Sequence, residues 1–142
     1  MKSILLSILG LILGALSNGF IVQLGAQVVE APKGLDLSTE QGLAKAMPLM
    51  GVEHFIFPFL AHALGTLIGA YFVTRVRVDK PLIHSLAIGF AFLAGGVMMV
   101  VMLPQTPLWF ILLDLLVAYL PMAYLGYRLG SLRFIQSGPA EK

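Results

Sequence analysis

The sequence predicts an all-α integral membrane protein built as a bundle of four transmembrane helices. Composition is the first observation: 58% of the 142 residues are hydrophobic and only 11% are charged, too few for the surface of a soluble domain. The second is the presence of four apolar runs, each close to the roughly 20 residues that cross a bilayer. Backbone polar groups must be paired in lipid, so we expect such long continuous runs to be helices.

The first span is predicted over residues 4–28. Lys2 and Ser3 precede an apolar stretch, as in a signal peptide, and small residues follow at Ala15 and Ser17. The apolar character nevertheless continues as far as Val29, well past a cleavage site of that kind. We therefore expect a retained membrane helix.

The segment 29–49 links the first span to the second. A proline and a glycine break the chain early in it, and Ser38, with Gln41 three residues later, has the pattern of a helix start capped by Ser38. We expect a short helix over residues 39–47 that lies on the outer membrane surface. A plain connector is the alternative.

Three further apolar runs complete the bundle and make residues 1–142 a single transmembrane domain. These spans are expected over residues 50–73, 82–102 and 108–129, and a tail over residues 130–142 follows. Pro58 and Pro121 lie inside the second and fourth spans, where the missing backbone N–H is expected to kink the helix.

Basic residues indicate the orientation of the chain. Two lysines lie in the segment 29–49. If the spans alternate in direction, the other basic residues all lie on the side of the membrane that holds the two termini: Lys2, Arg75, Arg77, Lys80, Arg128, Arg133 and Lys142. The positive-inside rule then predicts that both termini are cytoplasmic, in a bacterial inner membrane. The net charge of +2 does not indicate a nucleic-acid partner, and the lipid bilayer is the expected surrounding.

The two halves of the chain resemble each other. Residues 9–17 can be aligned with residues 88–96, and Phe55 can be aligned with Phe110, which brings Ala63 onto Ala118. Two similar hairpins in the same orientation predict a parallel repeat, related by an axis along the membrane normal.

Small residues recur four positions apart in three of the spans, which allows helix backbones to approach closely. They are Gly10 and Gly14 in the first span, Ala61, Gly65 and Gly69 in the second, and Ala91 and Gly95 in the third. Packing within one bundle is the first interpretation. The alternative is a face for a homodimer or for another membrane protein.

Asp114 lies inside the fourth apolar run, where a carboxylate costs at least about 2.5–3.5 kcal/mol. Counting about 1.5 Å per residue from the outer ends of the spans places His62, Asn18 and Gln23 at a similar depth. We expect Asp114 to pair with His62, and Asn18 and Gln23 to complete the hydrogen bonding. Tyr119 is deep enough to reach a polar partner. The group forms either a structural clamp or a ligand or proton site open to the outside, unless the helix register keeps His62 and Asp114 apart.

Glu53 and His54 are predicted at the mouth of that pocket. His54 and His62 share a helix face but stand about 12 Å apart, too far to bind one metal ion together. A metal would need His62 with Asp114, or Glu53 with His54 and a loop carboxylate, and neither set has a recognised ligand spacing. His84 is expected to be an interfacial residue. We expect no metal, no cofactor and no catalytic residues, because no hydrolase, phosphate-binding or zinc motif is present.

Two stretches carry a resemblance to known proteins. Residues 53–70, EHFIFPFLAHALGTLIGA, and residues 109–119, WFILLDLLVAY, resemble those of a family of small bacterial four-span membrane proteins that is classed as uncharacterised. The resemblance implies a four-helix membrane fold over most of the chain, but it implies no activity and no functional residues. The chain does not match small multidrug exporters, which have a glutamate in the first span.

Three functions are compatible with these observations. The first is a small carrier or channel for a proton, an ion or a small solute, which uses the polar pocket around His62 and Asp114. The second is a structural or accessory subunit that binds another membrane protein through its small-residue stripes. The third is a lipid-binding or lipid-modifying protein. We favour transport, because two ionisable residues at one depth require a purpose, and we do not expect an enzyme.

Overall fold

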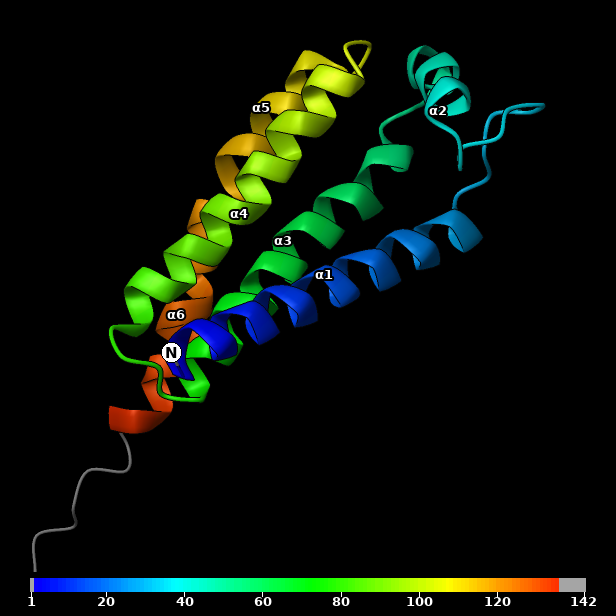
Figure 1. The fold of residues 1–142 in the computed structure, drawn as a ribbon. Helices are drawn as coiled ribbons and strands as arrows, with labels where there is room; N and C mark the ends of the chain where they lie inside the picture. The colour runs from blue at the N-terminus through cyan, green and yellow to red at the C-terminus, as the bar shows by residue number, and fades with distance from the viewer. Residues whose placement is uncertain (1, 136–142) are drawn as a thin grey trace, which may run out of the picture.

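The computed structural model describes residues 2–135, and that part of the chain is helical, without strands (Figure 1). In chain order the helices are α1 (Lys2–Val28), α2 (Glu40–Ala46), α3 (Glu53–Arg75), α4 (Pro81–Met102), α5 (Leu108–Val117) and α6 (Leu120–Ile135), with a short 3-10 helix, Met47–Leu49, after α2. Four stretches are long and apolar enough to cross a membrane: α1, α3, α4 and the combined stretch Leu108–Leu132. The predicted all-helical class with four such stretches is confirmed.

The helices extend beyond the predicted spans at several ends. α6 continues to Ile135, so the first part of the predicted tail over residues 130–142 is helical, and the rest of it lies outside the described residues. α3 runs without interruption through Pro58, which was expected to kink it.

α3 is the central helix of the bundle. It lies beside α1 and also contacts α4, α5 and α6 (Figure 1). Among the helices of the described chain, α1 contacts only α3 and α4. If a twofold axis related the two hairpins, α1 would pack against α6 in the same way as α4 packs against α3. The predicted parallel-related hairpins therefore do not pack as equivalent units.

Four glycines bring the backbones of α1 and α3 together. A Cβ on Gly14 would lie 2.6 Å from the carbonyl oxygen of Gly65, and a Cβ on Gly65 would lie 2.8 Å from that of Gly14. Gly10 and Gly69 approach each other in the same reciprocal way, at 3.0 and 2.7 Å. Because the neighbour is backbone, it cannot move aside cheaply, so these positions require glycine.

The other predicted packing residues divide into two groups. Ala61 is fully buried in α3. Ala91 and Gly95 in α4 are exposed, and a Cβ on Gly95 would have no neighbour within 4 Å. The α4 glycines that pack inside the chain are Gly89, against α6, and Gly96, against the α5–α6 connection. Ala91 and Gly95 therefore do not pack inside the described chain, and the alternative of a face for a partner stays a prediction, because the four-residue spacing alone does not show which face of a helix meets its neighbours.

α3 ends in a Schellman motif in which an arginine takes the usual place of glycine. The N–H of Arg77 donates to the carbonyl of Thr74 and the N–H of Val78 donates to that of Val73, while Val78 and Val73 belong to one apolar cluster. Arg77 has φ of 56°, and Lys80, the N-cap of α4, has φ of 52°. A side chain in this left-handed region costs about 1 kcal/mol or more, so the turn holds two unfavourable residues.

The fourth predicted span, residues 108–129, consists of two helices instead of one. α5 ends at Val117, Ala118 and Tyr119 form a turn, and α6 begins one residue before Pro121. Proline has no N–H to donate to the carbonyl four residues earlier, which here is that of Val117, and its ring clashes with that carbonyl. The break follows from this missing bond.

α2 is capped by a different residue from the one predicted. The side chain of Thr39 accepts the N–H of Gly42, whereas the hydroxyl and the N–H of Ser38 both donate to the carboxylate of Asp36, at 2.6 and 2.9 Å. The Ser38 cap was predicted wrongly because Asp36, two residues earlier, is a stronger acceptor for that hydroxyl.

The segment that contains α2 and the 3-10 helix covers one end of the bundle. Met47 packs with Phe55, Leu103 and Phe110, which come from the start of α3, the residue after α4 and the start of α5. Ala46 is fully buried. Since the segment contains a helix and supplies core residues, it is more than the plain connector considered as an alternative.

We predict that Gly14→Ala lowers the melting temperature, because the added methyl group meets the backbone of Gly65. The expected destabilisation is about 1–3 kcal/mol, the usual range for overpacking. Gly19→Ala is the matched control on the same helix, since a Cβ there has no neighbour within 4 Å. Thermal unfolding of the purified protein in detergent measures both, and equal melting temperatures would contradict the glycine contact.

We also predict that Ser38→Ala raises the pKa of Asp36. Hydrogen bonds from the side chain and then the backbone of Ser38 lower that pKa in the folded protein. This local stabilisation is present above the ordinary pKa of aspartate and is lost as the pH falls through the lowered folded value. NMR titration of the Asp36 carboxyl carbon measures the shift, with Ser38→Thr, which keeps the hydroxyl, as the control. An unchanged pKa in the alanine variant would contradict the side-chain contribution.

Candidate functional site

Asp114 and His62 meet between α5 and α3. The Nδ1 atom of His62 lies 2.9 Å from each carboxylate oxygen of Asp114. The side chain of Asp114 is 6% exposed and that of His62 is 23% exposed. The structure therefore brings together the two residues that the depth count placed at one level, with the carboxylate buried and the imidazole partly accessible.

Tyr119 completes the group from the turn between α5 and α6. Its hydroxyl donates to Oδ2 of Asp114 at 2.7 Å and lies 3.0 Å from Nδ1 of His62. Its ring stacks on the imidazole, with 5.6 Å between the ring centroids. Gly96 of α4 leaves the space for the phenol end, because a Cβ there would collide with the hydroxyl. We call these three residues, His62, Asp114 and Tyr119, the polar cluster.

The electrostatics of the polar cluster depend on where its protons lie. An ionised carboxylate only accepts hydrogen bonds, so Nδ1 of His62 must carry a proton and donate it to Asp114 while Tyr119 donates from the other side. Two charge-assisted hydrogen bonds offset the cost, about 2.5–3.5 kcal/mol, of an aspartate inside an apolar segment. No hydrogen bond from the described residues reaches Nε2 of His62, and the partly exposed ring makes this nitrogen the accessible edge of the cluster.

Apolar packing encloses the polar cluster on the other sides. Ala63 and Ala118 are buried against Tyr119, and partly buried side chains surround them: Phe59, Phe92, Leu93, Leu115 and Met122. The hydroxyl of Thr66 donates to the backbone carbonyl of His62 at 2.8 Å. This bond satisfies Thr66, which is fully buried, within its own helix.

Two other residues predicted at this depth do not join the polar cluster. Asn18 is half-buried on α1 and packs on Gly65 of α3, and Gln23 is exposed. In the described part of the chain no hydrogen bond connects either of them to His62 or Asp114. Counting along a helix gives the depth of a side chain but not its direction around the helix axis.

The predicted pocket mouth has a different role in the structure. The ring nitrogens Nδ1 and Nε2 of His54 lie 3.3 and 3.1 Å from the backbone carbonyl oxygens of Gly51 and Glu30. His54 thus ties the start of the loop to the start of α3, with the exposed carboxylate of Glu53 3.4 Å away. Within residues 2–135, no three histidine, aspartate or glutamate side chains are placed to hold a metal ion.

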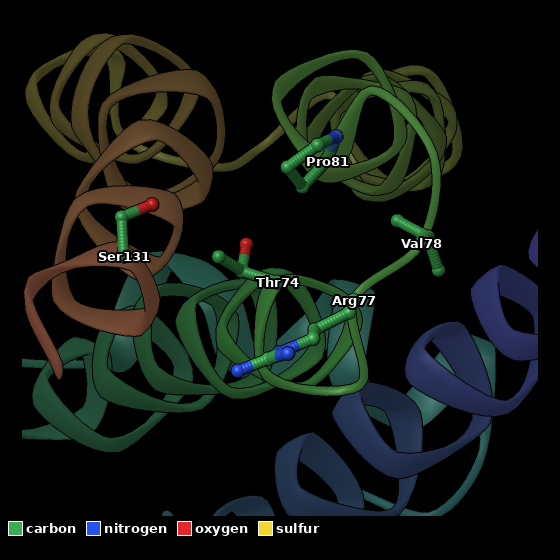
Figure 2. A pocket seen from close by; sticks show the side chains of 5 residues that line it. All are labelled: Thr74, Arg77, Val78, Pro81 and Ser131. Carbon is green, nitrogen blue, oxygen red and sulfur yellow. The ribbon is translucent and has the colours of Figure 1, made fainter. Parts of the chain in front are cut away.

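Two cavities between the helices of residues 2–135 lie away from the polar cluster, and neither of them is lined by His62 or Asp114. One lies where α3 ends, α4 begins and α6 passes, and is lined by Thr74, Arg77, Val78, Pro81 and Ser131 (Figure 2). The other is an apolar groove between α1 and α4 that contains Ser7 and His84.

Sequence reasoning missed two polar contacts between helices. The hydroxyl of Ser7 lies 2.7 Å from Nδ1 of His84, which we had expected to be merely interfacial. Thr74 and Ser85 are both buried, their hydroxyls lie 3.2 Å apart, and both donate to the carbonyl of Ala70. The available signal was the presence of serine and threonine within apolar spans, where their hydroxyls need a partner.

We predict that Tyr119→Phe lowers the melting temperature, because the buried carboxylate of Asp114 loses one of its donors. The expected cost is about 0.6–2 kcal/mol, the range for hydrogen bonds between membrane helices. Tyr124→Phe is the control, since the Tyr124 hydroxyl only accepts from Arg128 at an exposed position. Thermal unfolding in detergent makes the comparison, and a Tyr119→Phe variant as stable as the control would contradict the role of this hydroxyl.

No family model matches this sequence, and no curated protein or solved structure matches it.

Proposed function

We propose that this protein is a small proton carrier or channel of the bacterial inner membrane and that the polar cluster is its proton site. One observation carries the proposal: a buried carboxylate, Asp114, is hydrogen-bonded to a histidine whose other ring nitrogen is at an accessible edge. Ionisable residues within membrane helices are rare, and they mark ion pathways and proton relays.

The short distances in the polar cluster favour a proton over a larger ion. Separations of 2.7–3.0 Å between its nitrogen and oxygen atoms are direct hydrogen bonds, with no space for a cation among them. A proton taken up at Nε2 of His62 gives an imidazolium. Nδ1 then passes its own proton to Asp114, which leaves a neutral imidazole and a carboxylic acid. Histidine is suited to this transfer because its two nitrogens exchange roles.

The break between α5 and α6 supports a moving part. Asp114 is on α5, and Tyr119 is in the two-residue turn that separates α5 from α6. Interrupted helices are frequent at the binding sites of membrane carriers. In the proposed cycle, α5 tilts about this turn, which separates Asp114 from His62 and exposes the carboxylic acid to the opposite side.

The proposed orientation has both termini in the cytoplasm. Its support is the concentration of basic residues at the end of the bundle where Lys2 and the α3–α4 turn lie, which we call the basic end. The polar cluster then lies in the half of the bilayer nearer to α2, and His62 takes up its proton from the outside.

A structural or accessory subunit is the second candidate, and the face of α4 favours it. Ala91 and Gly95 are exposed four residues apart, and Gly95 has open space around it. Such a pair accepts the backbone of a helix from a second copy or from another membrane protein. The polar cluster would then only hold α3 and α5 together.

Proton flux into proteoliposomes, reported by a trapped pH-sensitive dye, tests the proposal. We expect Asp114→Asn to reduce flux to that of protein-free vesicles, because asparagine cannot accept the proton from His62. Glu40→Gln removes an exposed carboxylate in α2 and should leave flux unchanged. Circular dichroism and gel filtration check that both variants are folded.

Flux that survives Asp114→Asn in a folded variant would overturn the proton site. If Asp114→Asn does not fold, His62→Gln replaces it in the same assay, and flux at the wild-type rate would again refute the proposal. An absence of flux in the wild-type protein at every imposed gradient, together with a fixed membrane-protein partner after native purification, would favour the accessory subunit.

A further inference from the structure

The cavity at the basic end has a charged group, hydroxyls and apolar carbon in its walls. It has a volume of about 220 Å³ and is lined by Thr74, Arg77, Val78, Pro81 and Ser131 (Figure 2). A cavity of this size is smaller than the roughly 300–1,000 Å³ that hold whole drug-sized ligands. It suits a compact polar group instead.

Arg77 occupies a backbone position that favours glycine. It is the left-handed residue of the Schellman motif at the end of α3, with φ of 56°. Glycine would adopt this conformation without strain, so the backbone does not explain an arginine here. The side chain lines the cavity, which gives it a use that glycine could not have.

The two hydroxyls in the cavity wall have oxygens that can accept further hydrogen bonds. Ser131 donates its proton to the carbonyl of Tyr127, and Thr74 donates to that of Ala70. Figure 2 shows the Thr74 hydroxyl directed towards the space between α4 and α6. These oxygens match a ligand that itself carries hydroxyl groups.

The charge near the cavity favours an anion. Arg75 ends α3, and the turn that follows carries Arg77 and Lys80 and one acidic residue, Asp79. The carboxylate of Asp79 accepts from Ser3 on α1 at 3.3 Å and is not among the residues that line the cavity. The guanidinium of Arg77 therefore contributes the formal charge of the lining.

We propose that this cavity binds the headgroup of an anionic phospholipid, with the phosphate on Arg77 and headgroup hydroxyls on Ser131 and Thr74. Arginine binds phosphate through two parallel N–H donors. Basic pockets between helices at the end of a membrane bundle are placed to meet lipid phosphates. The site is separate from the polar cluster, and it does not depend on proton transport.

The test is thermal unfolding of the full chain in detergent micelles with four additions: dioleoylphosphatidylglycerol, dioleoylphosphatidylcholine, inorganic phosphate or none. We expect phosphatidylglycerol to raise the melting temperature more than the other three. A shift with inorganic phosphate but none with phosphatidylglycerol would overturn the assignment to a lipid.

Two glycine variants distinguish binding from backbone relief. Arg77→Gly relieves the left-handed residue, so we expect it to raise the melting temperature without lipid and to abolish the shift caused by phosphatidylglycerol. Lys80→Gly is the matched control, because Lys80 is also basic and left-handed, with φ of 52°, but does not line the cavity. It should raise the melting temperature in the same way and keep the lipid shift.

Native mass spectrometry of the same variants gives an independent measure of lipid affinity. Arg77→Gly should weaken phosphatidylglycerol binding by at least about tenfold, the size expected for loss of a charge-assisted hydrogen bond. Affinity retained in Arg77→Gly, or lost equally in Lys80→Gly, would overturn the proposal, since either result means that general basicity alone attracts the lipid.

Discussion

The hydrogen bonds that Asp114 accepts from His62 and Tyr119 are the interaction on which the arrangement of the helices depends. A carboxylate in an apolar segment is stable only with partners, and its two partners come from α3 and from the turn after α5. Gly96 on α4 leaves the space that the Tyr119 hydroxyl occupies. One buried charge thus fixes the positions of three of the four candidate spans relative to one another.

α3 holds the bundle together through two different kinds of surface. Towards α1 it presents Gly65 and Gly69, which make backbone contact and leave no space for side chains. Towards its other neighbours it presents His62 and Thr74, whose side chains lie within hydrogen-bond distance of Asp114 on α5 and Ser85 on α4. The first surface allows the helices to approach closely. The second fixes the rotation of α3 about its axis, because a rotation would separate His62 from the buried carboxylate of Asp114.

The helical class and the approximate limits of the spans were predictable from the sequence, because they follow from apolar length alone. The meeting of His62 with Asp114 was predictable from depth, since these two residues lie farther from the ends of their apolar runs than the other acidic residues and histidines do. The exposure of Gln23 was not predictable, because a count along the chain does not give rotation about the helix axis. The division of the fourth span at Tyr119 was not predictable either. Pro121 indicated a disturbance of the helix nearby, but proline is compatible with both a kink and a complete break.

The sequence separation within the polar cluster has a consequence for how the protein is made. His62 precedes Asp114 by 52 residues, which is roughly 3–10 s of synthesis at about 5–20 residues per second. The second span therefore enters the bilayer with a histidine, which can do so as a neutral imidazole, before Asp114 has been translated. When Asp114 arrives, its partner is already at the right depth. The order of residues along the chain thus spares the membrane an isolated negative charge during insertion.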